Sequence, residues 1–468
     1  MRSKNRLFSL LALGLIAIAG VIFALHYLRD RSPHPPDNVI LIVMDALRAD
    51  HLSCNGYQTS RSVPLTPNID RLAREGINFK NAFCHISLTL PSMSTLFTSL
   101  YPSVHGIRSN EGRLPDAAVT LAEVFQRNDY KTAAFVSGGY VKSEFGLSRG
   151  FDIYVDNYDK ITNLSKKAVK WLKETGPTKF FMYFHALETH VPYNPPDEYK
   201  IPDDYSWDHI WAGSIQFVDK YKKANLQDIY NQEGFAEKVV RLYDGEIKYA
   251  DTEWGAFFDE LRSLGLYDDT LIILTADHGE ELGEHGEFGH KKLYEETTRV
   301  PLIMKLPGKQ QKIANRVIDS LVGHIDIMPT MNGLAKMPFP DYPLQGRNLW
   351  PLLKGKKTRD RTIFMERGNL LGLRTKDYKL LMGPQARPPL EFYDLAKDPQ
   401  EKSDLSASAE KDTVSAKRKL VASLGQINQE NERLALRFTG KNRKASSPED
   451  REKRKSLEED LRSLGYIR

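Results

Sequence analysis

Four residues in three separate segments carry side chains that could together bind a metal ion and attack an ester. They are Asp45, Thr89, Asp277 and His278. Two carboxylates and one imidazole are suitable ligands for one divalent cation, in the range from Ca²⁺ or Mg²⁺ to Mn²⁺ or Zn²⁺. A hydroxyl beside such a cation loses its proton readily and becomes a nucleophile. The set therefore predicts a metal-assisted attack on an anionic ester.

The positions of these residues relative to apolar segments support this prediction. Asp45 directly follows the apolar run 39–44, and Asp277 lies just beyond the run 271–274. Thr89 precedes the segment 91–97, which reads as a helix whose first turn suits Pro91. A helix N-terminus behind a nucleophile favours the anion that is attacked. Each feature has a simpler alternative, since such an Asp often forms a turn and such a Thr often caps a helix.

The elements that must position these side chains alternate along the chain. Continuous apolar runs of strand length occur at 39–44, 132–136, 180–184 and 271–274. Helical patterns lie between them, at 66–72, 121–125 and 239–264. This alternation predicts an α/β fold with a large, mostly parallel sheet covered by helices on both faces. Ligands of such sheets gather at the carboxyl ends of the strands, where the candidate residues lie.

The alternation of strand-like and helical segments ends at about residue 300. Shorter strand-like pieces at 300–304, 373–382 and 391–395 are separated by loops, which indicates a smaller antiparallel subdomain. We therefore expect a catalytic domain over 38–335, a C-terminal subdomain over 336–405 and a charged helical tail over 406–468. The last part of this tail, 451–468, mixes both signs of charge and is most simply a solvated helix, with a partner-binding element as the alternative.

The N-terminus predicts a membrane anchor. Basic residues precede an apolar run over 7–28, which is long enough to cross a bilayer core of ~30 Å. The alternative is a cleaved signal peptide, because the small residues Ala17 and Ala19 have the spacing of a cleavage site. We therefore expect an anchor over 1–31 and a linker over 32–37. Both readings place the catalytic domain on the non-cytoplasmic side, periplasmic or extracellular, in a single-pass protein.

Composition argues against a nucleic-acid partner. The 468 residues include 66 basic and 61 acidic side chains, a formal net charge of +5, and no basic tract is interleaved with aromatics. The two cysteines, Cys54 and Cys84, define neither a disulfide framework nor a zinc knuckle, although they could pair.

Beyond these physical patterns, the chain resembles the sulfatase family of the alkaline phosphatase superfamily. The matching strings, in the order of the family, are NVILIVMD at 38–45, LRADHL at 47–52, TPNIDRL at 66–72, LPS at 90–92, YP at 101–102, HVPY at 190–193, DHGE at 277–280, LYEE at 293–296, RVPLI at 299–303, DIMPT at 326–330, YDL at 393–395 and DP at 398–399. The resemblance implies a large α/β domain and a smaller domain with a four-stranded antiparallel sheet.

Departures from the family pattern concern the nucleophile and its surroundings. The family carries a Cys or Ser that is converted to formylglycine, whereas this chain has Thr89, so no formylglycine is expected. An Arg, another cation and a second metal-binding Asp of the pattern are replaced by Met93, Leu100 and Ala46. The remaining set is similar to lipoteichoic acid synthases and phosphoethanolamine transferases, in which a Thr attacks phosphorus directly. The flanking strings thus indicate sulfate esters and the core residues phosphate esters.

The resemblance also assigns roles to further residues. His190 and His290 lie where the family places groups that handle substrate oxygens, and the adjacent Lys291 is a candidate for binding the anion. The expected substrate is an anionic ester, namely a sulfated or phosphorylated glycan, lipid or small molecule. The expected function is a metal-dependent hydrolase or transferase with Thr89 as direct nucleophile. The alternative is a degenerate relative that retains the fold as a binding or scaffold protein.

Overall fold

The structure is a computed structural model that describes most of the chain outside its two ends. The described residues are 36–59, 63–176, 178–200, 233–308, 313–335, 337–338, 340–356, 358, 361–383 and 390–439. The expected anchor over 1–31, most of the linker over 32–37 and the tail beyond 439 lie outside these residues. Among the described helices, none combines the length and the apolar character needed to cross a membrane.

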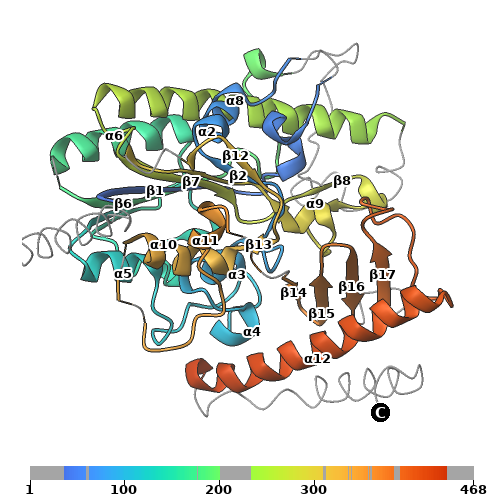
Figure 1. Ribbon diagram of the computed structural model, residues 1–468. Coiled ribbons are helices and arrows are strands. Elements are labelled where there is room, and N and C mark those ends of the chain that lie inside the picture. The colour runs from blue at the N-terminus through green and yellow to red at the C-terminus, as the bar shows by residue number, and fades with distance from the viewer. Residues whose placement is uncertain are drawn as a thin grey trace, which may run out of the picture.

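A single eight-stranded sheet forms the centre of the molecule (Figure 1). Its strands, in spatial order, are β12 (Arg316–Ile318), β2 (Ile77–Phe79), β11 (Leu302–Lys305), β7 (Thr270–Ala276), β1 (Asn38–Met44), β6 (Phe180–Ala186), β4 (Lys131–Val136) and β5 (Ile153–Val155). The five strands from β7 to β5 run parallel, whereas β11 runs antiparallel to β7 and β2. The predicted mostly parallel α/β sheet is confirmed.

The central strands are buried on both faces because helices cover each side. Every residue of β6 and β7 is buried, which explains their continuous apolar sequences. Trp254 of α8 (Phe235–Ser263) packs against Phe184 with ring centroids 5.0 Å apart. Phe97 of α3 (Thr89–Thr98) packs at 5.0 Å against Tyr183, the preceding residue of β6. Since neighbouring strand residues point to opposite faces, α8 and α3 cover opposite sides of the sheet, as Figure 1 shows.

The other helices divide between the two faces in the same way. With α8 lie α2 (Pro67–Glu75) and α6 (Ile161–Thr175), and with α3 lie α4 (Pro102–His105), α5 (Leu121–Arg127) and α10 (Ile327–Ala335) (Figure 1). The remaining short elements are β3 (Ala82–Phe83), β8 (Glu281–Leu282), β9 (Phe288–Gly289), α9 (Glu295–Thr298), β10 (Arg299–Val300), β13 (Val322–Gly323) and α11 (Trp350–Leu353).

A second, four-stranded antiparallel sheet follows near the C-terminus. It consists of β14 (Ile363–Arg367), β15 (Leu370–Arg374), β16 (Tyr378–Met382) and β17 (Leu390–Asp394), and α12 (Lys411–Thr439) lies beside it (Figure 1). The predicted small antiparallel sheet is therefore confirmed. The predicted piece 373–382 is not one strand, because it contains the end of β15, a three-residue turn and the whole of β16. The piece 300–304 was wrongly placed in the small sheet, because its main part, β11, hydrogen-bonds to β7 in the large one.

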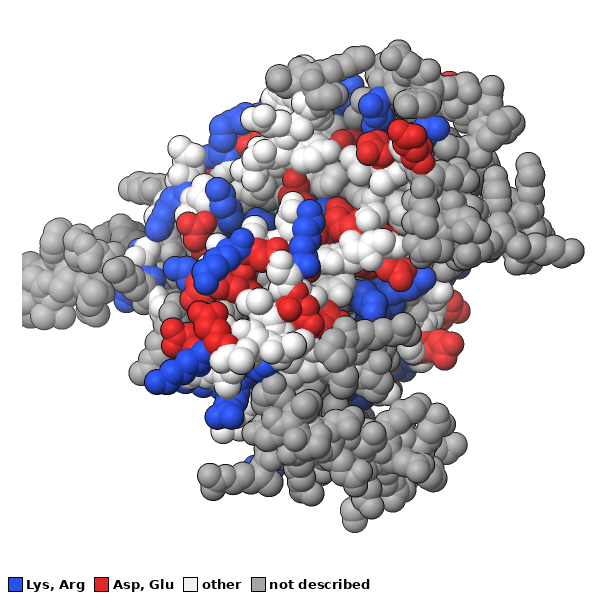
Figure 2. Space-filling view, turned by 90° about the vertical axis from the view of Figure 1, so that its right-hand side faces the viewer, with Lys and Arg blue, Asp and Glu red and all other residues white. Residues whose placement is uncertain are grey.

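The surface of the described residues carries both signs of charge. Acidic and basic side chains are interspersed on the face that holds the small sheet (Figure 2). This mixture agrees with the nearly balanced totals of 66 basic and 61 acidic residues in the sequence.

Candidate active site

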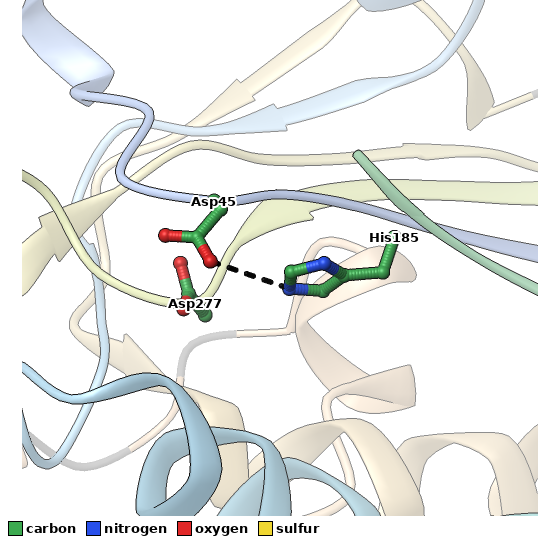
Figure 3. Close-up of side chains that lie close together, drawn as sticks. All are labelled: Asp45, His185 and Asp277. Atoms are coloured by element: carbon green, nitrogen blue, oxygen red, sulfur yellow. Dashed lines mark ion pairs between the residues drawn. The ribbon is translucent and has the colours of Figure 1, made fainter. Parts of the chain in front are cut away.

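Three side chains meet at the carboxyl edge of the large sheet, where the register of the strands brings them together. Met44 at the end of β1 pairs with both Ala186 of β6 and Ala276 of β7, so the three strands end at one level. Asp45 and Asp277 follow these ends, and His185 lies one residue before the end of β6. Candidate ligand atoms of these three residues all lie within 4.8 Å of one another. Figure 3 shows the side chains pointing toward one another.

Backbone hydrogen bonds hold Asp45 in place, so its carboxylate is available to bind a cation. Its amide donates to the carbonyl of Ala186 at 2.8 Å, and its own carbonyl accepts from the Thr189 hydroxyl at 2.5 Å. The side chain is buried, and among the described residues its Oδ1 has no hydrogen-bond partner. Burial, together with the Asp277 and Glu280 carboxylates, raises the pKa of Asp45 well above its usual range. A cation at this position would counter both effects.

Asp277 is oriented by one of its oxygens and leaves the other unused. Oδ1 accepts from the amides of Ala46 at 3.0 Å and His278 at 2.8 Å, whereas the buried Oδ2 has no partner among the described residues. Burial acts to raise the pKa of Asp277, but the nearby imidazoles His278 and His185 and the two amides lower it. The unused Oδ2 is therefore an oxygen of an ionised carboxylate.

The loop after β1 is strained so that the Ala46 amide can reach Asp277. Ala46 has a φ of 58°, in the left-handed region that few non-glycine residues adopt. Tyr243 of α8 fixes the loop, because its hydroxyl donates to the Ala46 carbonyl at 2.7 Å and accepts from the Arg48 amide at 2.8 Å. Backbone strain of this kind clusters at functional sites.

His278 presents a lone pair to the two carboxylates. Its Nδ1 donates to the Gly279 carbonyl at 2.8 Å, so Nε2 carries the lone pair. Nε2 lies 3.4 Å from Asp277 Oδ2 and 3.9 Å from Asp45 Oδ1 and has no hydrogen-bond partner among the described residues. Burial lowers the pKa of His278 to about 4, so the ring is neutral near pH 7. A side chain at Gly279 would collide with the Glu296 carbonyl, which explains the glycine that follows.

His185 is the member of the cluster that sequence reasoning missed. It is completely buried, its Nε2 lies 3.9 Å from Asp45 Oδ2, and neither ring nitrogen has a hydrogen-bond partner among the described residues. Burial lowers its pKa to about 4. A histidine in the otherwise apolar run FFMYFHA was a visible signal, but it lies within the strand rather than after it.

Thr89 is placed at the cluster by α3. The helix begins at Thr89, two residues earlier than the sequence pattern predicts, with Pro91 still in its first turn. The Thr89 hydroxyl donates to Asp45 Oδ2 at 3.4 Å, and the side chain is buried. Ser92, one turn along, donates to the Asp277 carbonyl at 2.6 Å and so ties the helix to β7. Asn110 accepts from the Leu90 amide at 3.1 Å and satisfies one free N–H of the first turn.

The two candidate histidines flank this cluster. The His290 ring lies 4.3 Å from the His278 ring and 5.7 Å from the His190 ring, measured between centroids. His290 Nδ1 lies 3.1 Å from the buried Glu280 carboxylate, and His190 Nδ1 donates to the Val191 carbonyl at 2.7 Å. Burial and the nearby His190 lower the pKa of His290 to about 3. Each ring therefore keeps only its Nε2 for a substrate oxygen.

Lys291 is exposed, and the structure fixes its backbone rather than its ammonium group. Its carbonyl accepts from Arg367 Nε at 2.9 Å, while Arg367 Nη1 donates to the Ser87 carbonyl at 2.6 Å. Arg367 ends β14 of the small sheet and was not a candidate in the sequence. It is a cation held beside the loop that leads to Thr89.

Three positions at which the sequence departs from the family pattern are apolar and buried. The side chains of Met93, Leu100 and Ala46 are completely buried in the hydrophobic interior. Thus no charged group replaces the cations at positions 93 and 100, and Ala46 contributes only its backbone.

The uncompensated atoms of the cluster fit a divalent cation. Among the described residues, Asp45 Oδ1, Asp277 Oδ2, His278 Nε2 and both nitrogens of His185 are buried without hydrogen-bond partners. Such atoms are costly to bury and call for a physical explanation. Carboxylate oxygens and imidazole lone pairs are the ligands that a bound metal ion requires, and those of Asp45, His185 and Asp277 lie within 4.8 Å of one another.

Comparisons with known proteins find relatives in both sequence and fold. A family model described as Sulfatase matches residues 37–337, and one described as N-sulphoglucosamine sulphohydrolase, C-terminal, matches residues 283–430. The chain is 25% identical over 458 residues to an arylsulfatase of Clostridium perfringens, which covers 82% of this chain and 93% of the relative. It is 24% identical over 475 residues to an N-acetylglucosamine-6-O-sulfatase of Bacteroides thetaiotaomicron, covering 80% and 83%. The fold is similar to a phosphonate monoester hydrolase of Agrobacterium radiobacter, with a TM-score of 0.71, 23% identity and coverage of 84% and 96%.

Proposed function

This chain belongs to the sulfatase family of ester hydrolases, and from that premise we propose that it cleaves anionic esters with an unmodified Thr89 as nucleophile and prefers phosphate to sulfate esters. The observation that carries the proposal is the position of the Thr89 hydroxyl. It lies at the start of α3 and donates to Asp45 at 3.4 Å, beside a cluster of ligand atoms without partners.

Asp45, Asp277, His278 and His185 would hold the divalent cation that the cluster fits. When bound, the cation would lower the pKa of the Thr89 hydroxyl and stabilise negative charge on the ester. The protein supplies the rest of the geometry, because the Ser92 bond and the Asn110 bond fix α3 relative to β7.

The first half of the reaction forms a covalent ester on Thr89. Thr89 Oγ1 attacks phosphorus, its proton passes to Asp45 Oδ2, and the bond from phosphorus to the leaving oxygen breaks. In this proposal His190 reacts as the imidazolium, with Nδ1 donating to the Val191 carbonyl, and gives the leaving oxygen its Nε2 proton. In the second half, His290 Nε2 takes a proton from water or an acceptor alcohol, whose oxygen attacks phosphorus. The bond from phosphorus to Thr89 Oγ1 breaks, Oγ1 takes back its proton from Asp45 Oδ2, and the proton on His290 passes to solvent. Glu280 orients His290 for this role through Nδ1.

The chemistry of a single hydroxyl favours phosphate over sulfate. A formylglycine hydrate carries two hydroxyl groups, and the second expels sulfate while the aldehyde is restored. Thr89 has one hydroxyl, so a sulfate bound to it could leave only by attack at sulfur. A phosphoryl group leaves such an ester when water or an alcohol attacks phosphorus, a step that enzymes accelerate by positioning the reactants and stabilising the charge. The substrate class that we propose is a phosphorylated or sulfated glycan, lipid or small molecule, and the name of the Bacteroides relative supports the glycan.

Trapping the covalent intermediate tests the proposal. The protein is mixed with an aryl phosphate or phosphodiester, quenched at low pH and digested, and the peptides are analysed by mass spectrometry. We expect a phosphate on the peptide that contains Thr89. Turnover of phosphate esters should exceed that of aryl sulfates, Thr89→Ala should abolish both, and Thr89→Ser should retain part of the activity because the oxygen survives.

A matched control uses another threonine of the same helix. Thr98 of α3 donates to the Ser94 carbonyl and lies at the far end of the helix, so Thr98→Val should retain activity and the Thr89 phosphopeptide. Robust sulfatase activity in Thr89→Ala would contradict the nucleophile assignment. An absence of turnover on both ester classes in the metal-loaded protein would favour the degenerate binding protein instead.

A further inference from the structure

The cluster at the sheet edge contains as many imidazoles as carboxylates. We infer that His185 is a metal ligand and that the site selects a nitrogen-binding transition ion of the zinc type over Ca²⁺ and Mg²⁺. This inference deepens the proposed function and rests on it for the presence of a metal, but it makes a separate claim about which metal is bound.

The first step concerns His185, whose burial is not compensated by the protein. The side chain is completely buried, yet neither Nδ1 nor Nε2 has a hydrogen-bond partner among the described residues. The nearby hydroxyls do not supply one, because Ser137 Oγ and Tyr183 Oη are themselves buried without partners. A structural histidine would be expected to form at least one hydrogen bond. Its Nε2 instead lies 3.9 Å from Asp45 Oδ2 and faces the cluster (Figure 3).

The second step concerns His278, which is already in the tautomer of a ligand. Metal-binding histidines commonly donate their second ring N–H to a carbonyl or carboxylate, which leaves the other nitrogen for the metal. His278 Nδ1 does this with the Gly279 carbonyl at 2.8 Å. Its bare Nε2 lies 3.4 Å from Asp277 Oδ2. Two imidazole nitrogens therefore face the same pair of carboxylates.

The third step concerns the supply of oxygen ligands. Ca²⁺ takes about 6–8 oxygens and Mg²⁺ demands a near-octahedral shell of oxygens. Here Asp277 Oδ1 is occupied by two amides, so the described side chains of the cluster offer Asp45, one oxygen of Asp277 and the Thr89 hydroxyl. Zinc is satisfied by about four ligands and binds imidazole well. Ala46, buried and without a polar side chain, adds no oxygen.

A metal competition experiment on the whole protein tests this inference without an activity assay. The purified protein is stripped with a chelator and dialysed against equal concentrations of Zn²⁺, Mn²⁺, Mg²⁺ and Ca²⁺, and the bound ions are measured by mass spectrometry. We expect about one zinc-type ion per chain and Ca²⁺ and Mg²⁺ at background. X-ray absorption of the zinc-loaded protein should show scattering from two imidazoles. Preferential binding of Ca²⁺ or Mg²⁺, or a spectrum with a single imidazole, would overturn the inference.

Variants of His185 provide a second test of the inference. His185→Ala should weaken zinc binding by about 100-fold or more, since even partners that only orient a ligand contribute about 10–100-fold. His185→Asp replaces the imidazole by a carboxylate and should reduce the preference for zinc over Mg²⁺ and Ca²⁺. The control is His105→Gln, because His105 is also a buried histidine but hydrogen-bonds to Thr95 in α3. This variant should bind zinc as tightly as the wild type. Unchanged zinc affinity in folded His185→Ala would exclude His185 as a ligand.

This result and that of the trapping experiment are independent. A zinc protein without phosphate on Thr89 would remove the nucleophile and leave the metal assignment standing. A Thr89 phosphopeptide in a protein that selects Mg²⁺ would support the nucleophile and contradict the metal assignment.

Discussion

At the scale of residues, the site depends on atoms that the protein leaves without partners. Asp45, Asp277 and His278 each use backbone contacts to hold a side chain whose remaining polar atom faces the others. This arrangement is unfavourable without a cation, because two carboxylates are buried within a few ångströms of each other. The folded apoprotein should therefore be less stable than the metal-loaded protein.

Removing any of these three ligands should remove the metal. We expect Asp45→Ala, Asp277→Ala and His278→Ala each to lose most of the bound cation and all activity, because each change deletes a lone pair that the site cannot replace. Metal content is measured by mass spectrometry after dialysis. Asp259→Ala, which removes a carboxylate on the outer face of α8, should bind metal like the wild type. Stoichiometric metal in all three ligand variants would show that the site lies elsewhere.

The residues that could be predicted from the sequence share one property. Asp45 directly follows its apolar run, and two residues separate Asp277 from the run 271–274, so their place at the sheet edge could be derived from strand length alone. His185 lies inside a strand, where a histidine is usually part of the core, and its role becomes visible only from its lack of partners. Arg367 reaches the loop before Thr89 from another sheet, a contact that no local sequence pattern predicts. The roles of His190 and His290 came from the family resemblance.

At the scale of elements, the register of β1, β6 and β7 and the attachment of α3 determine the geometry. The strands could be predicted because their apolar runs have strand length and lack helical periodicity. The strand that pairs with β11 could not be predicted, because a short apolar run does not indicate which other strand it will bind. The first residue of α3 was also misplaced, because Thr89 and Leu90 precede the proline that marks a first turn.

The bond between Ser92 and β7 should affect catalysis more than stability. Ser92→Ala removes the hydrogen bond to the Asp277 carbonyl, at a cost of about 1 kcal/mol in the free energy of unfolding. It also frees the helix that carries Thr89, and a misplacement of about 1 Å can cost up to about 100-fold in rate. We therefore expect kcat on an aryl phosphate to fall at least about tenfold with KM little changed.

Thr98→Val provides the comparison, because it removes a buried hydroxyl from the other end of α3. Its stability should fall by a similar amount while kcat stays near that of the wild type. Equal kcat values in the two variants would mean that the bond of Ser92 does not position Thr89.

At the scale of the whole molecule, buried charges join the small sheet to the large domain. Lys379 of β16 is completely buried and lies 2.9 Å from Glu401 Oε1 and 3.2 Å from Glu295 Oε1. Burial acts to lower the pKa of Lys379, but the two carboxylates raise it, so the ammonium stays charged. Glu295 begins α9, a few residues after His290, so the network connects the small sheet to the segment that borders the site.

Breaking this network should be costly. Lys379→Met leaves the buried Glu401 carboxylate without its cation and leaves Glu295 with Arg374 as its remaining cationic partner. We expect the free energy of unfolding to fall by about 3–5 kcal/mol in urea titrations. The matched control is Lys397→Met, since Lys397 pairs with Asp394 at the surface and its loss should leave the free energy of unfolding almost unchanged. Equal stability of the two variants would show that the buried network does not hold the sheets together.

The last prediction concerns where the molecule resides, and it depends on residues outside the described structure. We propose that the apolar run 7–28 anchors the protein in a membrane with the catalytic domain on the non-cytoplasmic side, because Arg2, Lys4 and Arg6 favour a cytoplasmic N-terminus. The full-length protein should then sediment with membranes and resist extraction by high salt. Protease added outside the cytoplasmic membrane should digest the catalytic domain, whereas a cytoplasmic marker enzyme stays intact. A soluble protein whose sequence begins near Gly20 would replace the anchor by a signal peptide and leave export in place. A catalytic domain that is protected until the membrane is ruptured would contradict both, since the basic residues would then not have set the orientation.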